Sequence, residues 1–83
     1  MALASMREIL LEARREHFAV GYFEAWSIES TQAIVNAAEE AGSPVVIGFN
    51  GGILTRSDRI VKPADIEVFG AVGKTYAEKA TVP

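Results

Sequence analysis

Apolar and polar residues form two patterns along this chain. Some segments have the spacing of an amphipathic helix, and others are short uninterrupted apolar runs. Residues 6–16 place apolar side chains three or four positions apart, with charged side chains on the opposite face. This spacing predicts a short helix that ends near Glu16 or His17. Ser5 and Glu8 have the separation of a capping box, in which each side chain bonds the other's backbone amide.

Two longer helices are predicted from the residues at their ends. Ser27 suits the N-cap of a helix that continues to Ala41, and Gly42 suits the position just after it, before Ser43-Pro44 stops the helix. Pro63 suits the first position of a third helix, whose spacing continues to Lys79 or Ala80. The residues expected to be buried by the second helix are Ile28, Ile34, Val35, Ala38 and Ala41.

The uninterrupted apolar runs predict two strands, at Phe18–Phe23 and Val45–Phe49. Neither run alternates apolar with polar residues, and this lack of alternation is typical of strands buried on both faces of a parallel sheet. The order helix, strand, helix, strand, helix therefore indicates an α/β fold with adjacent parallel strands. Two such strands leave exposed edges, so residues 1–83 are expected to form a single partial domain, with a third strand starting near Thr81-Val82-Pro83.

Composition narrows the classes of function. The chain has 83 residues, no cysteine and a net charge of -3, with acidic and basic residues interspersed. The sequence lacks the stripe of basic residues that would suggest a nucleic-acid partner. No apolar stretch has the length of a membrane span. Arg7 and Glu8 interrupt the first apolar residues before a signal-peptide core could form. The expectation is a cytoplasmic protein that forms a homo-oligomer.

Several segments of the sequence resemble the class II fructose-bisphosphate and tagatose-bisphosphate aldolases. The resemblance runs from Ala4 to Ile47, weakens from Asn50 to Pro63, and returns in the last helix and Val82-Pro83. The segments that carry it are Ser5-Met-Arg-Glu-Ile-Leu10, Phe18-Ala-Val-Gly-Tyr-Phe23, Glu29-Ser30-x-Gln32-Ala33-Ile34 and Ala37-Ala-Glu-Glu-Ala-Gly-Ser-Pro-Val-Val-Ile47.

This resemblance implies the N-terminal part of a (β/α)₈ TIM barrel that uses zinc to cleave ketose bisphosphates by retro-aldol chemistry. In that family the strand beginning at Val82-Pro83 ends in a catalytic aspartate and the first zinc histidine, both beyond Pro83. The resemblance therefore implies zinc and a phosphorylated sugar for the full-length protein. It implies no catalytic residue, no metal ligand and no bound zinc for these 83 residues.

Candidate substrate-binding residues follow the two predicted strands. In a barrel, the residues after the carboxyl ends of the strands form the active site. These positions hold Glu24 and Ser27 after the first strand and Asn50, Gly51 and Gly52 after the second. The family usually has asparagines where Glu24 and Ser27 stand, and often a serine at Asn50. Each position also has a plain interpretation, namely a solvated acid, a helix cap and a turn.

Other polar residues have structural interpretations. His17 precedes the first strand and is expected to be a surface or helix-end residue, since one histidine alone does not make a zinc site. Trp26 is expected to pack at the barrel rim. The basic residues of the loop before Pro63 are expected to be solvated.

Three functions remain open from the sequence. The first is a segment of an aldolase-type lyase, itself inactive. The second is a catalytically inactive member of the same barrel family, because Glu24 and Ser27 replace binding residues. The third is a small α/β binding module that completes its sheet by self-association.

Overall fold

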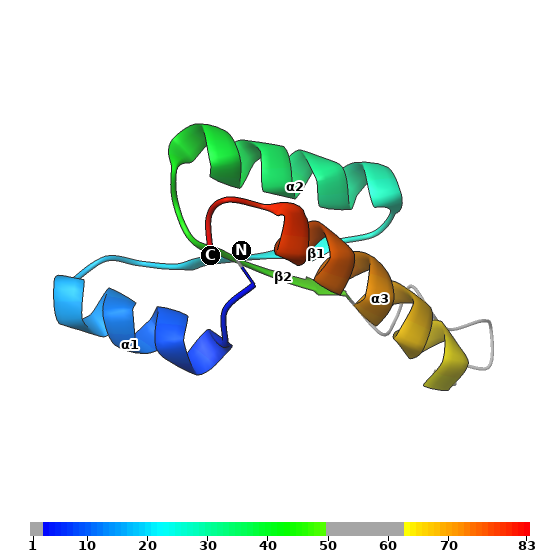
Figure 1. Ribbon diagram of the computed structural model, residues 1–83, viewed down its shortest axis with the longest axis horizontal. Helices are drawn as coiled ribbons and strands as arrows, with labels where there is room; N and C mark the ends of the chain where they lie inside the picture. Colours follow the sequence, from blue (N-terminus) through cyan, green and yellow to red (C-terminus); the bar gives the residue numbers. More distant parts are fainter. Residues whose placement is uncertain (1–2, 50–62) are drawn as a thin grey trace.

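The computed structural model describes residues 3–49 and 63–83 (Figure 1). Helices and strands alternate in the predicted order. The elements are α1 (Met6–Glu16), β1 (Gly21–Ala25), α2 (Ile28–Ala41), β2 (Val45–Phe49) and α3 (Pro63–Lys79). Both longer helices and the second strand have the predicted bounds. None of the helices in the described ranges has the length and hydropathy needed to cross a bilayer.

The two strands pair in parallel, as predicted. The register runs from Gly21 opposite Val45 to Ala25 opposite Phe49. The predicted bounds of the first strand, Phe18–Phe23, were wrong, because the ladder begins three residues later and ends two residues later. The reason lies in the partner strand: Pro44 has no N–H to donate, and the chain before it turns back to α2, so residues 18–20 have no strand beside them.

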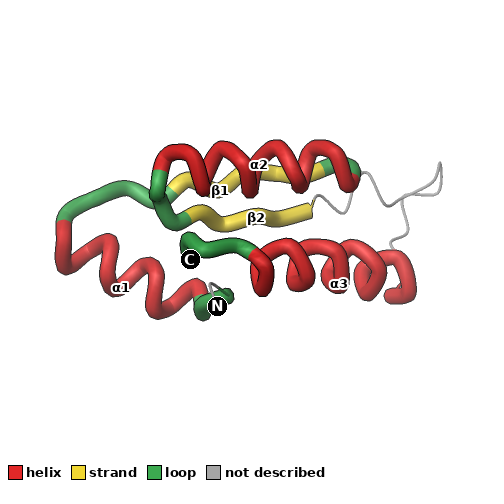
Figure 2. The backbone as a smooth tube through the Cα atoms, turned by 45° about the horizontal axis from the view of Figure 1, so that its top comes forward, coloured by secondary structure: helices red, strands yellow, loops and turns green. Residues whose placement is uncertain are grey.

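Helices α2 and α3 cover one face of this sheet (Figure 2). Helix α2 lies nearest β1, and α3 lies beside α2 and against β2. The side chain of Phe49 packs on Phe69 of α3, with ring centroids 5.2 Å apart. It also approaches Gly73, where an added Cβ would lie 3.0 Å from the Phe49 ring. Neighbouring residues of a strand face opposite sides of the sheet. Because Phe49 faces the helices, Gly48 and Val46 face away from them.

The core of the described residues is small. It consists of Ile9, Ala13, Ala25, Val35 and Ala38, together with the fully buried Thr31. Thr31 is tolerated there because its hydroxyl donates to the carbonyl oxygen of Ser27 at 2.7 Å. The prediction that Ile28 and Ala41 are buried was wrong, because both are exposed, Ile28 by 59%. They are the first and last residues of α2, beyond the part of the helix that packs on the sheet.

The helix ends follow the predicted local signals. The Ser5 side chain accepts from the Glu8 amide at 3.1 Å, which is one half of the predicted capping box. His17 ends α1 in the left-handed conformation, with φ 58°, which confirms it as a helix-end residue. At the end of α2, Gly42 has φ 62°, and its amide reaches the carbonyls of Ala38 and Glu39.

We expect Gly42→Ala to lower the free energy of unfolding by about 1 kcal/mol, since a Cβ is disfavoured at positive φ even though nothing crowds this position. The matched control is Gly70→Ala. Gly70 lies inside α3, where an added Cβ would meet no atom within 4 Å, and there alanine should stabilise the helix by roughly 0.5–1 kcal/mol. Urea denaturation followed by circular dichroism gives both values. Equal effects of the two substitutions would contradict the left-handed cap.

Candidate functional site

The carboxyl ends of β1 and β2 lie at the same edge of the sheet. This follows from the parallel register, which sets Glu24 opposite Gly48 and Ala25 opposite Phe49. Residues that leave the two strands therefore start from neighbouring points. Asn50, Gly51 and Gly52 lie outside the described residues, so their closeness to Glu24 stays a prediction.

Tyr22, Glu24, Val46 and Gly48 share the sheet face that α2 and α3 leave uncovered. They are alternate residues of the two strands, directly paired as Tyr22 with Val46 and Glu24 with Gly48. Glu24 is exposed on this face. A carboxylate at this place can accept hydrogen bonds from hydroxyl groups or pair with a cation, and it repels a bare phosphate.

The Tyr22 ring lies directly over Gly48. A Cβ added at Gly48 would fall 2.1 Å from the Tyr22 hydroxyl oxygen. The ring can therefore occupy this position only because Gly48 has no side chain. The Tyr22 ring therefore lies over the residue that pairs with Glu24 in the register of the two strands. Sequence reasoning overlooked Tyr22. The signal was available, because residues two apart in a strand share a face and Tyr22 stands two positions before Glu24.

We expect Gly48→Ala to displace the Tyr22 ring, with a loss of unfolding free energy below about 1 kcal/mol because the ring is 58% exposed and can rotate away. Near-ultraviolet circular dichroism of the tyrosines reports the displacement. In a Tyr22→Ala chain the same Gly48→Ala change should instead stabilise the strand by roughly 0.5–1 kcal/mol. The same sign of effect in both chains would show that Tyr22 and Gly48 are not coupled.

The start of α2 forms a closed hydrogen-bonded cap. The Ser27 hydroxyl oxygen accepts from the Ser30 amide at 3.1 Å, and the Ser30 hydroxyl oxygen accepts from the amides of Ser27 at 2.8 Å and Trp26 at 2.7 Å. Ser27 is thus used as a helix cap, and its contact with substrate stays a prediction. The indole of Trp26, expected to pack at a rim, is 67% exposed.

The described residues do not fit a zinc site. His17 caps α1 on the amino side of β1, away from the edge that carries Glu24. In residues 3–49 and 63–83, no three His, Cys, Asp or Glu side chains come close enough to hold a metal ion. A protein zinc site takes about three or four such ligands.

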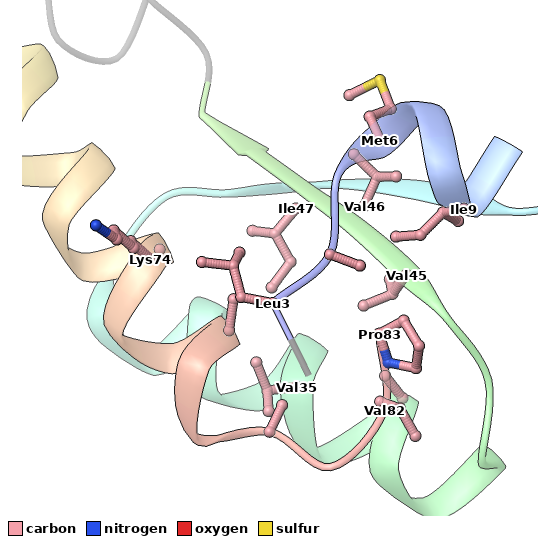
Figure 3. A pocket seen from close by; sticks show the side chains of 15 residues that line it. Leu3, Met6, Ile9, Val35, Val45, Val46, Ile47, Lys74, Val82 and Pro83 are labelled. Atoms are coloured by element: carbon pink, nitrogen blue, oxygen red, sulfur yellow. The ribbon is translucent and has the colours of Figure 1, made fainter. Parts of the chain in front are cut away.

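An apolar hollow of about 290 Å³ lies along β2 (Figure 3). Strand β2, helix α3 and residues near both ends of the chain border it, among them Leu3, Ile47 and Val82. Of the described residues in its lining, Lys74 alone is charged. The other described residues of its lining are apolar, so that the hollow offers an apolar surface along β2.

Comparison with known proteins shows to which family this chain is similar. The family model described as fructose-bisphosphate aldolase class-II matches residues 4–83. The uncharacterized protein YdjI of Escherichia coli (strain K12) is 35% identical over 81 residues, which is 98% of this chain and 27% of YdjI. No solved structure matches the chain.

Two named aldolases match a shorter stretch. The fructose-bisphosphate aldolase of Geobacillus stearothermophilus is 52% identical over 52 residues, and the probable fructose-bisphosphate aldolase of Bacillus subtilis (strain 168) is 48% identical over 52 residues. Each match covers 63% of this chain and 18% of the relative. The matched part of the chain thus spans 18% of the two aldolases and 27% of YdjI.

The structure agrees with the predicted fold class. Three helices and two parallel strands, in alternating order, correspond to the N-terminal part of a TIM barrel. The family match covers nearly all of the sequence, from Ala4 to the last residue. This chain belongs to the class II fructose-bisphosphate aldolase family.

Proposed function

We propose that this chain is the N-terminal segment of a class II aldolase-like lyase that reversibly cleaves a phosphorylated ketose with the help of zinc. The family match over residues 4–83 is the observation that carries the proposal. The parallel pair of strands supports it, because their carboxyl ends meet at the edge where a barrel places its active site. A cytoplasmic location, a role in carbohydrate metabolism and a homo-oligomeric state are part of the same proposal.

The proposed role of this segment is to contact substrate. Glu24, Ser27 and Asn50–Gly52 would line one part of the pocket, while zinc, which polarises a carbonyl when bound, would be held by residues that the described part of the chain does not supply. Glu24 would accept a hydrogen bond from a sugar hydroxyl. The segment contributes binding and orientation, and we expect it to be inactive alone.

A second candidate is a catalytically inactive relative of the same family. The specific observation in its favour is the exposed carboxylate of Glu24, at a position where the aldolases that this sequence resembles usually have an asparagine. Near a phosphorylated substrate this charge would be repulsive unless it is paired with a cation. At a separation of 4 Å two unit charges repel by about 1 kcal/mol in water, and by more where solvent is excluded.

A chimera separates the two candidates. Residues 4–83 would replace the matching segment of the Geobacillus stearothermophilus fructose-bisphosphate aldolase, and the zinc-loaded protein would be assayed with fructose 1,6-bisphosphate. We expect measurable cleavage, and we expect Glu24→Asn to raise kcat/KM about fivefold or more by removing the repulsion.

The matched control for this change is Glu40→Gln, which removes the same charge from the far end of α2. It should leave kcat/KM within about twofold of the unmodified chimera, since exposed charges separated by more than a Debye length are largely screened. A folded, zinc-loaded chimera that stays inactive with Glu24→Asn would favour the inactive relative.

A further inference from the structure

Glu39 joins two parts of the chain that are far apart in sequence. It lies in the last turns of α2, and its carboxylate meets the residues that follow α3. One carboxylate oxygen, Oε1, accepts from the Thr81 amide at 2.5 Å and from the Val82 amide at 3.2 Å. The other oxygen, Oε2, accepts from the Thr81 hydroxyl. Three donors from two consecutive residues therefore converge on one side chain.

These contacts hold the chain where it leaves the helix. Helix α3 ends at Lys79, and the Ala80 amide still donates to the Tyr76 carbonyl at 3.1 Å. The next two amides donate to Glu39 instead. Hydrogen bonds to an ionised acceptor are stronger than neutral ones. In agreement, the Thr81 hydroxyl and the amides of Thr81 and Val82 hold the pKa of Glu39 below its ordinary value.

The next residue is held by the sheet. The Val45 amide, at the start of β2, donates to the carbonyl oxygen of Pro83 at 3.1 Å. Figure 2 shows the C-terminal segment beside β2, on the side away from β1. Val45 also stands opposite Gly21 in the register of the two strands. Residues of three segments, at Gly21, Val45 and Pro83, are thus aligned at one level of the sheet.

We propose that Glu39 is a positioning residue that sets the register of residues 81–83 against β2. A strand continuing from Pro83 would inherit this register. A slip by one residue would exchange the side chains on its two faces, so the residues meant for the site would turn toward the helices. This consequence rests on the proposed aldolase function, whereas the register itself does not.

The test is hydrogen–deuterium exchange of the 83-residue chain, read residue by residue by mass spectrometry with electron-transfer fragmentation. In Glu39→Ala we expect the amides of Thr81 and Val82 to exchange at least about threefold faster, because both lose a charged acceptor that solvent only partly screens. The Val45 amide should accelerate as well, although Glu39 does not contact it, because Pro83 loses its fixed position.

Glu40→Ala is the matched control. Glu40 is the next residue of the same helix, it is exposed, and its replacement removes the same charge and introduces the same good helix former. We expect it to leave all three rates unchanged. Glu39→Gln should give an intermediate rate, since its amide keeps one acceptor oxygen and replaces the other by a donor.

Three results would overturn the proposal. The first is exchange of Thr81 and Val82 in the unmodified chain at the rate of an unstructured peptide. The second is an equal acceleration by Glu40→Ala. The third is a Glu39→Ala chain in which Val45 keeps its original rate, since that would leave Glu39 a local cap with no influence on register. None of these measurements involves substrate or zinc, so their outcome is independent of the proposed activity.

Discussion

The 83-residue chain by itself is expected to show no measurable cleavage of fructose 1,6-bisphosphate and no tight binding of zinc. The physical reason is the supply of ligands. The whole sequence has one histidine and no cysteine, and within the described ranges, 3–49 and 63–83, no three His, Cys, Asp or Glu side chains come close enough to hold a metal ion. That histidine, His17, caps α1 on the amino side of β1. About three or four ligands are needed for a zinc site, and without the metal the carbonyl is not polarised.

The measurement is a coupled assay of triose phosphate release by the purified chain, with and without added zinc. The Geobacillus stearothermophilus aldolase serves as positive control under the same conditions. Turnover by the chain above that of a protein-free blank, abolished by a chelator, would show that these residues contain a complete active site and would contradict the proposed division of roles.

Self-association is the second large effect that we expect from the isolated chain. Strand β1 has its outer edge unpaired among the described residues, and the large apolar side chains of Phe23 and Trp26 are 52% and 67% exposed. An unpaired edge beside exposed apolar surface favours association with further copies. Sedimentation velocity over a wide range of concentrations should show species larger than the monomer.

Two substitutions at equally exposed residues locate the contact. Phe23 in β1 and Leu11 in α1 are both 52% exposed. We expect Phe23→Ser to weaken association about tenfold or more, since burying a phenylalanine contributes roughly 1.5–3 kcal/mol, whereas Leu11→Ser should change it much less. A chain that stays monomeric at high concentration and unfolds cooperatively would contradict this prediction. Equal effects of the two substitutions would place the contact away from β1.

The sequence predicted the type and order of every described element because the signals involved are local. Ser27 caps α2 through hydrogen bonds to Ser30, only three residues away. Gly42 ends the same helix because its positive φ suits a residue without a Cβ. The uninterrupted apolar run at Val45–Phe49 was sufficient to predict β2 and its bounds.

The features that the sequence did not reveal depend on contacts between distant residues. The bounds of β1 follow from where β2 begins, so a pattern within residues 18–23 could not define them. The burial of Thr31 and the exposure of Ile28 depend on which part of α2 lies over the sheet. The position of the Tyr22 ring depends on a glycine in the other strand.

The candidate site divides in the same way. The positional rule for barrels predicted Glu24 and Ser27 as substrate-binding residues from the sequence, and their contact with substrate stays a prediction. The parallel register brings the ends of both strands to one edge. The position of the Tyr22 ring over Gly48, the register partner of Glu24, became visible only in three dimensions. Asn50, Gly51 and Gly52 remain predictions from the sequence.

By itself, then, the sequence determined the helices, the second strand and the family resemblance, because spacing, caps and apolar runs act over a few residues. Only the tertiary structure decided the bounds of the first strand, the position of the Tyr22 ring over Gly48, and the contact of Glu39 with Thr81. That last contact joins residues 42 positions apart. No local pattern can encode such a pairing, because it exists only after α2, β2 and α3 have packed together.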